Sequence, residues 1–137
     1  MLSALQVADV GVIVISAVSG VEVGASQAWQ QCSARELPRM IVVNKLDREN
    51  TGYRQTLDII TTGWGRECVA INAPNGLEAD FTDTIDLISP DAESTDAADL
   101  RERLIEAVAE ADDDLAEKYL EDLTLNQKEL TAGLKAG

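Results

Sequence analysis

The sequence predicts an α/β fold in which parallel strands alternate with flanking helices and lead into a mostly helical second part. Two short β-branched runs, residues 10–15 and 40–44, are separated by a helix-length segment. A connection of this length joins parallel strands, so we expect a strand-helix-strand unit here. From residue 100 onward, apolar side chains recur at the spacings of three and four that are typical of helices.

The elements of the first part follow in order along the chain. Residues 10–15 form a continuous apolar run, which predicts a strand buried on both faces. A helix is expected over residues 23–36 and is ended by Pro38, and residues 40–44 form the second strand. The side chains of this helix that are expected to face the core are Val23, Ala28 and Cys32.

After residue 52 the pattern predicts a second helix, two further short strands and a turn. The helix is expected over residues 53–62, and Trp64 continues its apolar spacing, so we expect Trp64 to be a packing residue. Residues 68–71 are apolar and predict a third strand, and residues 83–88 predict a fourth. The segment 74–76 (Pro-Asn-Gly) between these strands is a turn signal.

The rest of the chain is polar at first and then helical. Residues 89–97 are rich in turn formers and predict a mobile linker. Asp114, with Glu117 three residues later, predicts the start of a new helix, and a last short helix is expected over residues 126–135. The side chains expected to form the core of these helices are Leu100, Leu104, Val108, Ala111, Leu115 and Tyr119.

Composition excludes several classes of function. The chain has 137 residues, 45% of them hydrophobic, and its apolar runs are far too short to span a bilayer. With no histidine present, Ser-His and Cys-His nucleophile pairs are absent, and Cys32 and Cys68 lack metal-ligand spacing. We therefore expect no metal site, no membrane segment, and two reduced thiols in a cytoplasmic protein.

The net charge of −14 is concentrated in one region. Residues 78–123 hold 17 acidic and 3 basic side chains, whereas acidic and basic side chains balance over the remainder. Such a surface repels phosphate backbones, so we expect no direct nucleic-acid binding by residues 78–123. A basic protein partner and simple solubility are both compatible with this charge.

The strand over residues 40–44 ends in the most informative residues of the chain, Asn44-Lys45-Leu46-Asp47. This sequence resembles the Asn-Lys-x-Asp guanine-reading loop of GTPases. A carboxylate at Asp47 can accept hydrogen bonds from both N1–H and the exocyclic amine of guanine, whereas adenine offers neither donor there. Lys45 would lay its aliphatic stem over the base, and Asn44 would tie neighbouring loops together.

The resemblance extends over nearly the whole chain and points to elongation factor G and its elongation factor G-like paralogues. The matching segments are residues 7–22, 37–39, 47–50, 74–76, 81, 86–87 and 115–120. The resemblance implies a partial Ras-like GTPase domain. Residues 1–73 would form the C-terminal half of its core, and residues 74–137 an acidic inserted subdomain with linker 89–97 and helices over 98–136. In elongation factor G that insert faces the ribosomal stalk protein, and the full-length factor binds the ribosome and GTP or GDP with Mg²⁺.

No Gly-x-x-x-x-Gly-Lys-Ser/Thr phosphate loop and no Asp-x-x-Gly switch turn occur in the sequence. We therefore expect an internal fragment of a larger GTPase that neither hydrolyses GTP nor binds nucleotide tightly by itself. The missing phosphate-loop strand would normally pair with residues 10–15, which predicts self-association through that strand. Two alternatives stay open at this point: an acidic protein-interaction module, and an adenine-using or unrelated α/β protein in which the tetrapeptide occurs by chance.

Overall fold

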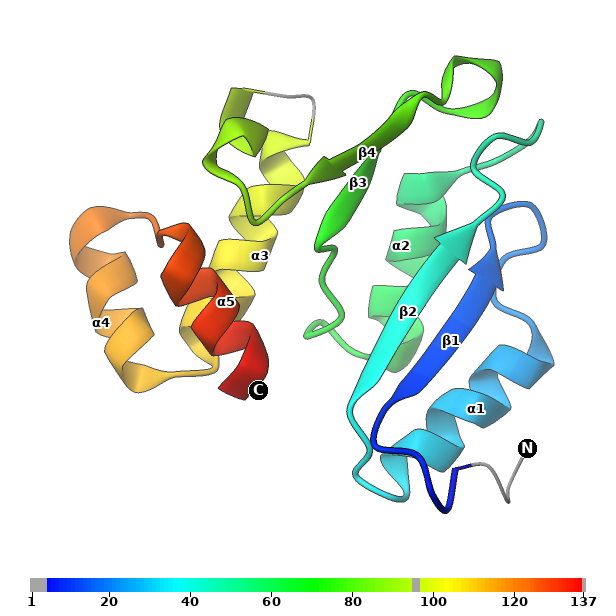
Figure 1. Cartoon of the computed structure of the whole chain (residues 1–137), viewed down its shortest axis with the longest axis horizontal. Coiled ribbons are helices and arrows are strands. Elements are labelled where there is room, and N and C mark those ends of the chain that lie inside the picture. Colours follow the sequence, from blue (N-terminus) through cyan, green and yellow to red (C-terminus); the bar gives the residue numbers. More distant parts are fainter. Residues whose placement is uncertain (1–4, 95–96, 137) are drawn as a thin grey trace. The chain divides into compact units, whose positions relative to one another are not determined.

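The computed structural model describes residues 5–94 and 97–136 of the chain (Figure 1). These residues form two compact units. Unit 1 comprises residues 1–65 and 76–81, and unit 2 comprises residues 66–75 and 82–137.

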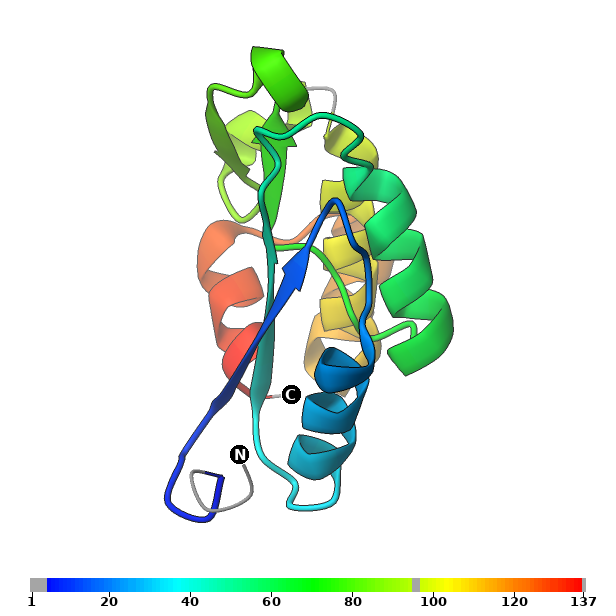
Figure 2. The same ribbon diagram turned by 90° about the vertical axis from the view of Figure 1, so that its right-hand side faces the viewer.

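Unit 1 is built on a parallel pair of strands. Strand β1 (Gly11–Ser16) pairs with β2 (Arg39–Asn44) in a register that places Gly11 beside Arg39 and Ser16 beside Asn44. Helices α1 (Val23–Ser33) and α2 (Tyr53–Trp64) lie on the same side of this sheet (Figure 2). The predicted strand-helix-strand unit with parallel strands is confirmed.

Only one face of β1 is buried. Ile13 and Ile15 point to the helical side and are almost fully buried, whereas Val12 and Val14 are 57% and 59% exposed. The prediction that this strand is buried on both faces was wrong, because both helices of the unit cover the isoleucine face. An apolar run alone does not distinguish a strand covered on one face from one covered on both.

Helix α1 ends three residues earlier than predicted. Glu36 adopts a left-handed conformation (φ 53°), and the backbone N–H of Leu37 donates to the carbonyl of Cys32 at 3.0 Å. This left-handed turn ends the helix before Pro38 is reached. Cys32 is buried as predicted, but Val23 is 74% exposed because it lies in the first turn, on the outer side of the helix.

Helix α2 is joined to α1 by an aromatic stack, and it extends two residues beyond the predicted end. The rings of Trp29 and Trp64 are parallel within 6°, with centroids 4.8 Å apart. Arg39 is the first residue of β2, and its guanidinium lies 4.1 Å from the centroid of the Trp29 ring. Trp64 is thus a packing residue, as predicted, and its partner is Trp29.

Unit 2 begins with an antiparallel hairpin. Strand β3 (Asn72–Asn75) pairs with β4 (Asp83–Asp86) so that Asn72 lies opposite Asp86. The strand predicted over residues 68–71 was wrong, because pairing with β4 selects the polar segment that follows the apolar run. Strand β4 ends before the predicted residue 88, since the carboxylate of Asp86 accepts a hydrogen bond from the N–H of Ile88 at 3.0 Å and starts a turn.

The rest of unit 2 is helical. Helix α3 (Ala98–Glu110) contacts both α4 (Asp113–Asp122) and α5 (Gln127–Ala136). Its buried side chains include the predicted Leu100, Leu104 and Val108. Ala111 is exposed, contrary to the prediction, because α3 ends at the preceding residue. The other large apolar side chains enclosed in this core are Leu87, Ile105, Leu125 and Leu130.

Two local expectations for unit 2 remain: the mobility of residues 89–97 stays a prediction, and the expected capping residue of α4 was wrong. The expected mobile linker over residues 89–97 contains the 3₁₀ helix η2 (Pro90–Ser94), which contacts α3, and Ala92 and Ala97 are buried; residues 95–96 lie outside the described residues. Helix α4 is capped by Asp112 rather than Asp114. The Asp112 carboxylate accepts hydrogen bonds from the backbone N–H groups of Asp114 and Leu115, both at 3.0 Å.

The division into units does not coincide with the expected boundary between residues 73 and 74. Residues 66–75 belong to unit 2 because β3 pairs with β4, and residues 76–81 belong to unit 1. That residues 74–137 form an inserted subdomain stays a prediction.

Candidate functional site

The Asn-Lys-Leu-Asp loop lies at the carboxyl edge of the parallel sheet in unit 1. Strand β2 ends at Asn44, which pairs with Ser16 at the end of β1. The carbonyl of Asn44 accepts a hydrogen bond from the N–H of Ala17 at 2.8 Å, so both strands end together. Open α/β sheets bind their ligands at this edge, where successive strands deliver their following loops.

The first half of the loop is a tight turn. Lys45 adopts a left-handed conformation (φ 65°), and its N–H donates to the side-chain Oδ1 of Asn44 at 2.8 Å. The carbonyl of Lys45 accepts a weak hydrogen bond from the N–H of Arg48 at 3.3 Å. The Asn44 side chain therefore supports the turn directly beside it, and the Lys45 side chain is exposed.

The second half of the loop alternates a buried and an exposed side chain. Leu46 is buried and anchors the loop, while the next side chain, Asp47, is exposed. A carboxylate oxygen of Asp47 lies 3.8 Å from Nε of Arg48, and these side chains are 63% and 72% exposed. Such a solvent-exposed pair is weak, so the carboxylate remains accessible to hydrogen-bond donors of a ligand.

A second segment of unit 1, residues 76–81, is hydrogen-bonded to this loop. The backbone N–H of Glu78 donates to the carbonyl of Leu46 at 2.8 Å. The Glu78 side chain accepts a hydrogen bond from the backbone N–H of Asn50 at 2.7 Å. No local pattern in the sequence predicts a contact between these two segments, since Gly76 marks a turn but not what the turn contacts.

Tyr53 opens helix α2 just after the loop and is buried. Burial raises the pKa of its phenol to about 12, although the nearby charge of Arg54 acts in the opposite direction. The ring is therefore neutral at physiological pH, and it anchors the segment that follows the loop.

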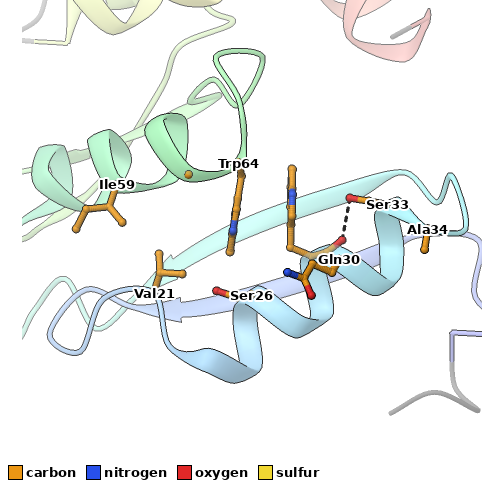
Figure 3. Close-up of a pocket in the computed structure, with 9 residues that line it drawn as sticks. Val21, Ser26, Gln30, Ser33, Ala34, Ile59 and Trp64 are labelled. Atoms are coloured by element: carbon orange, nitrogen blue, oxygen red, sulfur yellow. Dashed lines mark hydrogen bonds between the residues drawn. The ribbon is translucent and has the colours of Figure 1, made fainter.

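A groove of about 930 Å³ lies between α1 and α2. The Trp64 ring projects into it from the end of α2, with Val21 and Ile59 on one side (Figure 3). Ser26, Gln30 and Ser33 of α1 supply its polar groups, and the Ser33 hydroxyl donates to the carbonyl of Trp29 at 3.0 Å. Its lining residues all come from the segments around the two helices, so the loop over residues 44–47 is not part of this groove.

The described residues contain neither a cluster of metal-binding side chains nor a membrane-spanning helix. Across residues 5–94 and 97–136, no three His, Cys, Asp or Glu side chains come together in a way that could hold a metal ion. Within the same ranges, no helix has the length and apolar character needed to cross a bilayer.

Comparison with protein families excludes one of the two open alternatives, the unrelated α/β protein. The family model described as the elongation factor Tu GTP-binding domain matches residues 1–130 of the 137. The chain belongs to this family. It is thus part of a GTP-binding translation factor, and the chance origin of the tetrapeptide is excluded because the match extends far beyond residues 44–47.

Membership of the elongation factor Tu GTP-binding family implies that the full-length protein binds GTP or GDP together with Mg²⁺. The residues of this chain fit the base of such a nucleotide. They present an exposed carboxylate and an exposed lysine at the ligand-binding edge of a parallel sheet. The chain has no matching site for the phosphates of the nucleotide, because its 137 residues contain no Gly-x-x-x-x-Gly-Lys-Ser/Thr loop.

Proposed function

We propose that this chain supplies guanine recognition in an elongation factor G-like translational GTPase that acts on the ribosome in the cytoplasm. The observation that carries the proposal is the exposed carboxylate of Asp47 at the carboxyl edge of β2, in a chain that belongs to the elongation factor Tu GTP-binding family. The elongation factor G-like assignment rests on residues 7–22 and on the segments around residues 76 and 81.

Three residues of the loop have a chemical role in guanine recognition. The two oxygens of the Asp47 carboxylate accept hydrogen bonds from guanine N1–H and from its 2-amino group. Lys45 covers one face of the base with its aliphatic stem. Asn44 holds the turn through the hydrogen bond from the Lys45 N–H to its side chain, which keeps both groups at the same edge of the sheet.

The affinity of the 137-residue chain for nucleotide is expected to be low. Phosphate groups and Mg²⁺ supply most nucleotide affinity through backbone amides, a lysine and a hydroxyl of the phosphate loop. Without that loop, the base contacts alone give weak binding and no GTP hydrolysis. A micromolar dissociation constant for GTP, measured by calorimetry on residues 1–137, would contradict this expectation.

The test exchanges the base that the loop prefers. Xanthine carries a carbonyl where guanine carries its 2-amino group, so an amide at position 47 matches xanthine and mismatches guanine. We expect GDP at millimolar concentration to shift the amide NMR signals around residues 44–47 of the wild-type chain, and ADP to leave them in place. In Asp47→Asn, the affinity for GDP should fall about tenfold or more while XDP becomes the better ligand.

The control variant is Asp80→Asn, which removes a similar exposed carboxylate from unit 1 outside the loop. This variant should still bind GDP more tightly than XDP. Equal shifts from GDP and ADP in the wild-type chain, or an unchanged preference in Asp47→Asn, would refute guanine recognition by this loop.

A second candidate function is supported by the exposed face of α4. Leu120 and Leu123 are 77% and 75% exposed at the C-terminal end of this helix. The surrounding exposed carboxylates are Asp113, Asp114, Glu117, Glu121 and Asp122. Apolar side chains framed by negative charge suit a partner that presents an apolar patch ringed by basic residues, and the resemblance suggests the ribosomal stalk protein.

A binding assay with the purified stalk protein separates the two candidates. Replacing Asp113 and Asp114 by Asn, together with Leu120→Ala, should abolish binding, and high salt should weaken it for the wild-type chain. Asp112 is left unchanged, because it caps α4 and its loss would disturb the helix itself. Asp47→Ala should bind like the wild-type chain. Loss of binding in Asp47→Ala alone would contradict the assignment to α4.

A further inference from the structure

We infer that Glu78 is a positioning residue that holds the guanine-reading loop in its binding conformation. The inference rests on the proposed guanine recognition for its functional meaning, but its structural part stands on the contacts of Glu78 alone. We call residues 76–81 the strap, because this segment runs beside the loop and is hydrogen-bonded to it at two places.

The two contacts of Glu78 lie on either side of Asp47. Its backbone N–H donates to the carbonyl of Leu46, one residue before Asp47, at 2.8 Å. Its carboxylate accepts from the N–H of Asn50, three residues after Asp47, at 2.7 Å. One residue of the strap thus fixes both ends of the segment that carries the base-reading carboxylate.

The Leu46 anchor is reinforced from a second direction. The hydroxyl of Thr51 donates to the same Leu46 carbonyl at 3.4 Å. The Leu46 side chain is buried, so the backbone before Asp47 is held by packing and by hydrogen bonds together. Asn50 has a left-handed conformation (φ 63°), which asparagine adopts more readily than most residues, and in this turn its N–H is directed at the Glu78 carboxylate.

Left-handed backbone conformations in the strap place Glu78 in contact with the loop. Glu78 adopts φ 55° and Gly76 adopts φ 79°. A side chain at Gly76 would overlap the backbone carbonyl of Asp80, so the strap can fold back on itself only with glycine there. A left-handed glutamate is disfavoured locally, and such a conformation persists where its surroundings require it. Here it directs the N–H and the carboxylate of one residue toward the loop.

Removing the Glu78 carboxylate should loosen the loop without removing any group that reads the base. The N–H of Asn50 would lose its acceptor, and the segment 47–50 would gain freedom that nucleotide binding must then restrict. The expected consequence is weaker guanine binding with unchanged preference for guanine over xanthine. A group that contacts the base would instead change the preference itself.

The first experiment measures hydrogen exchange of individual backbone amides by NMR in the 137-residue chain, without nucleotide. In Glu78→Ala, the Asn50 amide should exchange about tenfold faster or more, while the amides of Ile13, Ile15 and Ile60 in the core keep their wild-type rates. Glu78→Gln should restore most of the Asn50 protection, because its side-chain carbonyl can still accept the hydrogen bond.

Two comparisons make this result decisive. Glu49→Ala removes an exposed carboxylate from the same loop and should leave the Asn50 amide protected. Faster exchange throughout unit 1 in Glu78→Ala would indicate a general loss of stability and would overturn the positioning role. An unchanged Asn50 rate in Glu78→Ala would overturn it as well.

The second experiment adds GDP and XDP, and it separates the failure of this inference from the failure of the proposed function. If the wild-type chain prefers GDP, Glu78→Ala should weaken GDP binding about five- to tenfold and keep GDP preferred over XDP. If that GDP affinity is unchanged, the positioning role is overturned although guanine recognition stands. If the wild-type chain shows no preference for GDP, guanine recognition is refuted, and the exchange experiment still decides whether Glu78 orders the loop.

Discussion

The two units of this protein bury their apolar side chains in different ways. In unit 2, α3 lies against α4, α5 and η2, and Leu87, Leu104 and Leu130 have no exposed surface. In unit 1, the two helices cover only one face of β1 and β2, and the valines of the other face remain exposed. Unit 2 thus has an enclosed core, whereas unit 1 depends on a one-sided sheet and on the stack of Trp29 and Trp64. The candidate site belongs to the less enclosed unit.

The largest expected effect tests the enclosed core. Leu104→Ala should lower the free energy of unfolding of unit 2 by about 2–5 kcal/mol, because it leaves a cavity among α3, α4 and α5. Both tryptophans of the chain, Trp29 and Trp64, belong to unit 1. In Leu104→Ala, the loss of helical circular dichroism should therefore occur at a lower urea concentration than in the wild-type chain. Tryptophan fluorescence follows the unfolding of unit 1 separately.

The matched control is Leu120→Ala, which truncates an exposed leucine of α4 and should change the unfolding free energy by less than about 0.5 kcal/mol. If Leu104→Ala shifts the fluorescence transition as far as the helical one, the two units unfold as one cooperative body. That outcome would contradict the independent stability of the two units.

The next effect tests the aromatic stack in unit 1. Trp64→Ala should destabilise this unit by about 1–3 kcal/mol, since it removes a parallel ring contact and exposes part of the space between α1 and α2. The measurement is urea unfolding followed by the fluorescence of Trp29. Trp64→Phe keeps an aromatic ring at this position and should recover a large part of the loss. An equal loss in both variants would show that the stacked geometry contributes nothing.

The uncovered face and edge of β1 lead to a third test. We propose that this strand mediates self-association, because in the described residues it pairs with β2 on one side and presents Val12 and Val14 on its open face. Light scattering at increasing concentration should show dimers or larger species. Val14→Lys should raise the dissociation constant about tenfold or more.

Val23→Lys makes the same charge change at an exposed valine of α1, away from the sheet, and should associate like the wild-type chain. A wild-type chain that stays monomeric at high concentration would contradict the proposal. So would equal association of the Val14→Lys and Val23→Lys variants.

The sequence predicted the parallel strands and the helices well, because their signals are local. Apolar runs and spacings of three and four residues locate β1, β2, α2 and α3, and an Asn-Lys-x-Asp pattern directly after a strand locates the loop. The residues of the enclosed core, such as Leu100 and Leu104, follow from the same periodicity.

What the sequence did not predict depends on distant partners. The pairing of β3 with β4, and not its own composition, decides where β3 lies. Whether both faces of β1 are buried depends on which elements lie against it. The hydrogen bond from Asn50 to Glu78 joins residues 28 positions apart, and both residues are in left-handed turns. A glutamate in the sequence does not predict a left-handed conformation. Local patterns thus located the loop but not the residue that holds it.

The smallest expected effect concerns the start of α5 in unit 2. Glu129 accepts hydrogen bonds from the Lys118 ammonium and from the backbone N–H of Asn126, while the Asn126 side chain accepts from the N–H of Glu129 at 3.1 Å. This reciprocal arrangement is a capping box with an added ion pair. The Lys118 contact, followed by the Asn126 N–H, lowers the pKa of Glu129 below its ordinary value of 4.5.

The sign of the pH dependence follows from that lowered pKa. A carboxylate whose pKa is lower in the folded state stabilises the fold above pH 4.5, and this stabilisation is lost as the pH falls through the folded-state value. Glu129→Gln cannot ionise, so urea midpoints of wild type and variant should differ at pH 7 and converge below pH 4.5. Glu121→Gln removes an exposed charge from α4 and controls for net charge. A difference for Glu129→Gln that is constant from pH 7 to pH 3 would mean that the charge of Glu129 does not contribute to the stability of unit 2.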